Sequence, residues 1–197
     1  MRYPSAMNAT VPLTNRPEKL RLRSEDFLLL NDNGAFQDYG KTELIDGEIY
    51  YVNSRHLGHA RAKSRLTIEL ALALREMKSE LEAISEVGVR ASDHSVPEAD
   101  IVLTTQRDGG VVAADTVALA VEVADTTLNI DLGRKARLYA AAGVPEYWVI
   151  DMQVGRIVVQ AEPEGDRYTR RTEVRFGDPL YAVTIEGLVL RQLRLED

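Results

Sequence analysis

The sequence predicts an α/β fold in which a mixed β-sheet is flanked by helices. Three observations predict it: an Asp46-Gly47 pair between two strand-like runs, an amphipathic helical pattern from His59 to Met77, and a nearly uninterrupted apolar run from Val117 to Ala124. The order along the chain, a helix, three strands, a second helix and a further strand, is typical of a sheet with helices on its faces. Fold class alone does not indicate chemistry, so function must be inferred from individual residues.

The composition is that of one globular domain. The chain has 197 residues, of which 45% are hydrophobic, and this is enough to build a continuous core. Its 24 Lys and Arg residues against 31 Asp and Glu residues give a net charge of −7, unlike the basic surface of most nucleic-acid binders. The absence of cysteine excludes disulfides, a thiolate nucleophile and cysteine-ligated metals.

The sequence favours a cytoplasmic protein with no membrane partner. No stretch approaches the roughly 20 apolar residues of a membrane span, and the N-terminus lacks the apolar run of a signal peptide. Residues 1–17 contain proline and asparagine without apolar periodicity and are expected to form a flexible leader. Residues 18–197 are expected to form a single domain.

Local signals predict the first elements. Ser24 is expected to cap a short helix that extends to Leu30 and stops near Gly34. Because an Asp-Gly pair favours a two-residue β-turn, a hairpin is expected over residues 42–53.

The later elements follow from periodicity. The helix over residues 59–77 places Ala62, Leu66 and Leu70 on one face. A second helix is expected over residues 131–142, ended by Gly143. Strands are expected at residues 85–91, 99–104, 117–124, 146–151, 156–160 and 168–174.

Glu122 interrupts the apolar run over residues 117–124. A carboxylate buried in a strand is costly unless it is paired, hydrogen-bonded or bound to a metal. Strand alternation places Glu122 on one face with Ala118, Ala120 and Ala124, whose small side chains leave space beside it. Two interpretations follow: a structural glutamate paired with a core arginine or hydroxyl, or a functional acid.

Asp100 offers a second carboxylate. It lies near the beginning of the neighbouring strand-like segment and is expected to share a face with Glu98 and Val102. A position beside Glu122 is then expected, and a turn residue is the alternative.

Lys135 falls within the apolar face of its helix. With ~100° per residue, it lies about 60° from Leu132, whereas Arg134 and Arg137 fall on the opposite, solvated side. A surface ion pair with Asp131, one turn earlier, is the alternative for Lys135.

Two carboxylates and an inward lysine suit a Mg²⁺ site that hydrolyses a phosphodiester. Mg²⁺ is held by one or two carboxylates and keeps several waters. It polarises the phosphate and lowers the pKa of a bound water, while a lysine orients that water or stabilises the transition state.

Several separated motifs resemble the putative restriction endonuclease family of the PD-(D/E)XK nuclease superfamily. The resemblance covers about residues 24–190. The motifs are the run Asp100–Leu103, the run Val121–Thr127, the residues Asp131, Lys135 and Tyr139, the run Gly143–Asp151, the opening Glu43–Glu48 and the helix start His59–Leu66.

The resemblance implies a restriction-endonuclease-like core, a DNA-cleaving site that uses Mg²⁺ or Mn²⁺, and a homodimer. It makes Asp100 and Glu122 catalytic residues and metal ligands. Where the superfamily signature has proline and lysine, this chain has Ala99 and Ala124. Family members resemble it in moving the lysine to the following helix, which makes Lys135 the catalytic lysine.

Five further residues are weaker candidates for the site or for a binding role. Glu43 is expected to add a carboxylate to the site, as in related proteins, with an exposed strand glutamate as the alternative. Glu69 is expected to be solvated. His59 is expected to be buried and hydrogen-bonded, because its pairing with His56 lacks a third zinc ligand. Tyr147 and Trp148 are expected in the core or in a dimer contact.

The sequence therefore predicts a metal-dependent endodeoxyribonuclease acting on DNA. The alternative, which Ala124 favours, is a non-catalytic DNA-associated or protein-interaction module that retains the nuclease fold.

Overall fold

The computed structural model describes residues 16–52, 57–191, 193 and 195, and within them seven strands form one sheet in the order β5-β3-β4-β6-β7-β8-β9. The pairs β6–β7 and β3–β5 are parallel and the other pairs antiparallel, which confirms the predicted mixed sheet. The strands are β3 (Glu82–Arg90), β4 (Glu98–Thr104), β5 (Val112–Ala113), β6 (Val117–Ala124), β7 (Glu146–Asp151), β8 (Arg156–Glu164) and β9 (Arg167–Arg175).

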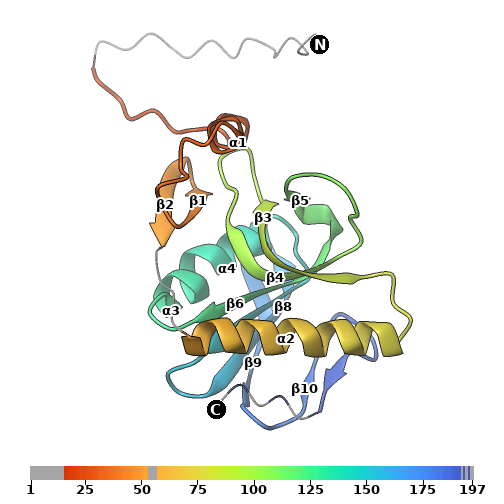
Figure 1. Ribbon diagram of the computed structural model, residues 1–197. Helices are drawn as coiled ribbons and strands as arrows, with labels where there is room; N and C mark the ends of the chain where they lie inside the picture. The colour runs from red at the N-terminus through yellow and green to blue at the C-terminus, as the bar shows by residue number, and fades with distance from the viewer. Residues whose placement is uncertain (1–15, 53–56, 192, 194, 196–197) are drawn as a thin grey trace.

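Helices cover both faces of the sheet (Figure 1). Helix α2 (Leu57–Glu76) lies on one face, where Leu66 and Leu70 belong to the same core cluster as Val121 of β6. A composite helix lies on the other face, where Tyr139 clusters with Ala120. Because β6 is covered on both sides, its near-continuous apolar sequence is explained.

The composite helix runs from Leu128 to Ala141 in three parts: α3 (Leu128–Ile130), a π-helical segment (Asp131–Lys135) and α4 (Ala136–Ala141). It begins three residues before the predicted start, and the π-helical segment was not predicted. The predicted end is confirmed, because Gly143 takes a positive φ of 78° and the N–H of Val144 returns to the carbonyl of Tyr139.

The first helix, α1 (Ser24–Asp32), differs from the prediction at its beginning. Arg23 is the capping residue and Ser24 is already helical. The Ser24 hydroxyl donates to the carbonyl of Ser92, so a tertiary contact takes the place of the expected cap.

Two hairpins complete the fold: β1 (Lys41–Ile45) with β2 (Glu48–Val52), and β10 (Leu180–Tyr181) with β11 (Val189–Leu190). The predicted Asp-Gly turn is confirmed, with φ of 51° at Asp46 and 80° at Gly47. A bridge between Leu44 and Val96 fixes β1 to the segment before β4. The last residue of the predicted hairpin, residue 53, lies outside the described residues.

Strands β8 and β9 are longer than predicted. The sequence does not indicate their additional residues, because these parts of the strands are polar and show no apolar alternation. None of the helices in the described ranges has the length and apolar character needed to cross a bilayer. Residues 1–15, which make up most of the predicted leader, lie outside the described residues.

Candidate active site

One cavity of about 840 Å³ brings together all four residues that the sequence singles out: Glu43, Asp100, Glu122 and Lys135. We call it the site cavity. Its walls come from the β1–β2 hairpin, the beginning of α2, strands β4 and β6, and the composite helix. Segments far apart in the sequence therefore meet at one place.

Lys135 is the centre of the first group of contacts. Its Nζ lies 3.0 Å from Oε1 of Glu122 and 2.9 Å from Oε2 of Glu43. The hydroxyl of Tyr139 donates to the same Oε1 of Glu122 at 3.2 Å. The inward orientation predicted for Lys135 is confirmed, since only 4% of the residue is exposed.

Glu43 is buried rather than an exposed strand residue. Its Oε2 accepts the backbone N–H of Glu98 at 3.1 Å as well as the contact from Lys135. The alternative of a solvated glutamate is therefore wrong, because the hairpin packs against β4 instead of standing free.

Asp100 is the centre of the second group. Strand register pairs Ile101 with Val121, which brings Asp100 to the level of Glu122 on the neighbouring strand. The backbone N–H of Val123 donates to Oδ2 of Asp100 at 2.8 Å. The turn alternative for Asp100 is wrong, because β4 already begins at Glu98.

Asp100 is surrounded by three cationic or ionisable side chains that are not among the predicted catalytic residues. Lys41 lies 3.2 Å and Lys63 3.7 Å from its Oδ1, and Nε2 of His59 lies 3.5 Å from its Oδ2. His59 is hydrogen-bonded as expected but only partly buried, and it lines the site cavity. Local periodicity does not predict these contacts, because they depend on how the hairpin and α2 dock.

The π-helical segment turns Asp131 inward together with Lys135. Asp131 is only 2% exposed, so a surface ion pair with Lys135 is ruled out; the two groups lie 4.0 Å apart within the protein. The hydroxyl of Thr127 donates to Oδ2 of Asp131 at 2.6 Å. Segments of π-helix are frequent at functional sites.

The helical wheel places Arg134 on the solvated side of the helix, but in the structure its side chain contacts the β1–β2 hairpin. Its Nε lies 2.9 Å from Oδ2 of Asp46, and its guanidinium stands over the ring of Tyr50 at 5.0 Å from the centroid. The β1–β2 hairpin covers this side of the helix around Arg134. Arg137, on the same side but further along, is exposed, as predicted.

Burial and charge set the protonation of the site. Burial raises the pKa of Glu122 to about 8 against the opposing effect of Lys135 and Lys41. Burial alone would lower the pKa of Lys135, but the charges of Glu122, Glu43 and Asp131 outweigh it and raise that pKa above its usual range. Lys135 is therefore an ammonium at neutral pH.

Asp100 shows the opposite behaviour. Burial alone would raise its pKa, but the hydrogen bond with His59, the charge of Lys41 and the N–H of Val123 together hold the pKa well below its usual range. Asp100 is therefore a carboxylate at all ordinary pH values.

The remaining candidates lie away from the site or in the core. Glu69 is exposed, as expected, and Tyr147 and Trp148 are fully buried core residues. His56 lies outside the described residues.

The donor set of the site cavity fits Mg²⁺. Asp100 and Glu122 provide hard carboxylate oxygens on adjacent strands, and Lys135 and Tyr139 both donate to Oε1 of Glu122. In the part of the chain that the structure describes, no three His, Asp or Glu residues are gathered closely enough to enclose a metal. Two carboxylates with water completing the shell are a common arrangement for Mg²⁺.

Comparison with known proteins gives a consistent result. Residues 24–193 match the Uma2 family, which is described as "Putative restriction endonuclease". The crystal structure of a putative nuclease belonging to DUF820 from Anabaena variabilis ATCC 29413 is similar, with a TM-score of 0.60 and 16% identity, over 82% of this chain and 89% of that chain. This second likeness concerns the fold alone. No curated protein matches the chain.

Proposed function

Since the chain belongs to the Uma2 family of putative restriction endonucleases, we propose that it is a metal-dependent endodeoxyribonuclease that hydrolyses phosphodiester bonds of DNA. One observation carries the proposal: Glu43, Asp100, Glu122 and Lys135, from four separate elements, line a single cavity. Mg²⁺ is the proposed cofactor, with Mn²⁺ as a substitute.

In this proposal Asp100 and Glu122 hold the cation. When bound, Mg²⁺ supplies polarisation of the phosphate and a bound water of lowered pKa. The N–H of Val123 holds Oδ2 of Asp100, and the Tyr139 hydroxyl holds Oε1 of Glu122, so both side chains are oriented by the protein before a cation binds.

Lys135 acts as a charge and not as a base. Its raised pKa keeps it protonated, so it can orient the attacking water and stabilise negative charge on the phosphate oxygens. Glu43 holds the ammonium from the other side at 2.9 Å. The water oxygen forms the new bond to phosphorus and releases its proton to solvent, while the bond to one ester oxygen breaks and that oxygen takes up a proton from solvent.

The test combines calorimetric titration of Mg²⁺ and Mn²⁺ with nicking of supercoiled plasmid. Wild type is expected to bind the cation and to nick, and Asp100→Asn and Glu122→Gln are expected to lose both properties while remaining folded. Glu69→Gln, an exposed acid on α2, is the matched control and is expected to behave as wild type.

The second candidate function is a non-catalytic DNA-associated or protein-interaction module that keeps the nuclease fold. Ala124 favours it, because the superfamily signature has lysine at that position. Folded wild type that neither binds metal nor nicks any form of DNA would establish this alternative over the nuclease. We also propose that residues 18–197 act as one domain, that the chain forms a homodimer and that it resides in the cytoplasm.

A further inference from the structure

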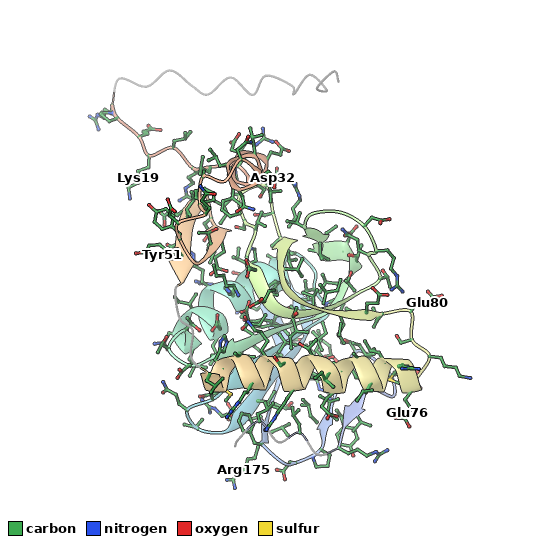
Figure 2. All side chains as sticks on the ribbon, in the orientation of Figure 1. Lys19, Asp32, Tyr51, Glu76, Glu80 and Arg175 are labelled. Carbon is green, nitrogen blue, oxygen red and sulfur yellow. The ribbon has the colours of Figure 1, made fainter. Side chains whose placement is uncertain are left out.

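Two exposed tyrosines stand at the rim of the site cavity. Tyr39, just before β1, and Tyr51, on β2, are 53% and 63% exposed, and both line the cavity. Their ring centroids lie 5.3 Å apart with the planes tilted by 60°. Figure 2 labels Tyr51 on the β1–β2 hairpin. Solvent-exposed aromatic faces beside a site are suited to stacking against another flat ring.

The floor of the cavity is deep. Asp100, Glu122 and Lys135 are each only 3–4% exposed. An intact duplex is a stiff rod whose bases are stacked inside, so its base faces are not available to a protein side chain. An unpaired strand has a flexible backbone and free base faces, and is therefore able to place a phosphate at the floor and a base at the rim.

The distribution of charge also favours an unpaired strand over a duplex. Lys41, Lys63, Arg134 and Lys135 line the cavity and are suited to one or a few phosphates. The whole chain has a net charge of −7, which opposes the wide electrostatic contact that duplex binding uses. Stacking on aromatic rings supplies affinity without a large basic surface.

We propose that the site takes unpaired DNA, with a nucleobase stacked on the Tyr39–Tyr51 pair and the adjoining phosphate among the cations of the site cavity. This inference rests on the proposed function, of which it specifies the substrate: single-stranded or locally unpaired DNA in preference to intact duplex.

Binding is measured by fluorescence anisotropy on a labelled 12-nucleotide single strand and on the duplex of the same sequence, without metal. The single strand is expected to bind at least tenfold more tightly. Tyr39→Ala and Tyr51→Ala are each expected to weaken single-strand binding roughly tenfold, the loss of one stacked base, while Tyr39→Phe and Tyr51→Phe keep it. Tyr181→Ala, an equally exposed tyrosine on β10, is the control and is expected to change nothing.

A spectroscopic readout reports the stacking itself. A strand that carries 2-aminopurine is expected to lose fluorescence on binding wild type, and to keep it with the two alanine variants. Equal affinity for strand and duplex, unchanged binding by both alanine variants, or no binding of the strand would each overturn the inference.

Cleavage with Mg²⁺ in the same preparations separates this inference from the proposed function. Equal cleavage of strand and duplex, unaffected by the tyrosine variants, would overturn the inference and leave the nuclease intact. Tyrosine-dependent binding and quenching without cleavage of any DNA would support the inference and overturn the nuclease.

Discussion

Two glutamates on neighbouring parallel strands are buried alike but face opposite sides of the sheet and have different partners. Glu122 on β6 is 3% exposed and Glu146 on β7 is fully buried. They face opposite sides of the sheet: Glu122 shares its face with Ala120, in the cluster under the composite helix, and Glu146 shares its face with Trp148, in the cluster under α2.

Their partners differ in chemistry. The carboxylate of Glu146 accepts from Nε1 of Trp148 at 2.6 Å, from the N–H groups of Val183 and Thr184, and from the Thr184 hydroxyl, all of them neutral donors. Glu122 has the Lys135 ammonium and lines the site cavity. The carboxylate of Glu146 joins the segment between β10 and β11 to the sheet. The carboxylate of Glu122 instead borders a cavity that has room for a ligand.

Glu122 and Glu146 show that burial alone does not separate a structural carboxylate from a functional one, because both are equally hidden. The number of neutral donors around Glu146 accounts for its burial without any ligand. The Lys135 ammonium and the cavity beside Glu122 are what favour chemistry there.

The largest effect is expected from Glu122→Gln. Replacing the acid by an amide of the same shape should lower the nicking rate by about 10²- to 10³-fold, because a carboxylate that can ionise and hold the cation is lost. Plasmid nicking under excess Mg²⁺ measures it, with thermal unfolding as the control for folding. An unchanged rate would remove Glu122 from the site and with it the contrast with Glu146.

Lys135→Met sharpens the same contrast, because it removes the cation and keeps both strand carboxylates. Nicking is expected to fall about 10²-fold, whereas Mg²⁺ binding in calorimetry should persist through Asp100 and Glu122. Loss of metal binding to the same degree as in Glu122→Gln would instead mean that Lys135 only holds the acids in place.

Glu146→Gln is expected to act on stability and not on chemistry. The amide nitrogen cannot accept hydrogen bonds, so about two of the donors around it lose their partner, at a cost of about 2–4 kcal/mol in the free energy of unfolding. Urea denaturation measures this cost. The nicking rate per folded molecule should stay as in wild type, and a selective loss of rate would make Glu146 part of the site after all.

Arg134→Met should give the smallest effect. It removes a partly exposed ion pair with Asp46 and the contact with the Tyr50 ring, together worth about 1 kcal/mol. The melting temperature should fall by about 2–4 °C. Nicking should fall only a few-fold, through looser docking of the hairpin that carries Glu43. No change in either quantity would show that the hairpin is held by its other contacts.

Sequence patterns predicted the elements that depend on neighbours in the chain. The hairpin follows from Asp46-Gly47, and the central strand from the run over residues 117–124, since turn chemistry and alternation are local. The inward orientation of Lys135 also follows from a local period, even though a π-helical segment shifts the later turns.

The same patterns could not supply contacts between distant segments. Lys41 and His59 reach Asp100 only because a hairpin and a helix dock beside β4, and no local signal encodes that docking. The helical wheel predicts a solvated Arg134 for the same reason, since it takes no account of the hairpin that docks over this residue. Glu146 begins a strand that is buried along its whole length, and all of its donors except Trp148 lie more than 30 residues away, on Val183 and Thr184.

Because the site residues come from distant segments, packing of the core and assembly of the site can be followed separately as the chain folds. Glu43 reaches Lys135 only when the β1–β2 hairpin has docked through its bridge from Leu44 to Val96. The single tryptophan, Trp148, is buried in the other half of the core, under α2. Trp148 fluorescence therefore reports packing of the core under α2, whereas the contact between Glu43 and Lys135 also requires the docked hairpin.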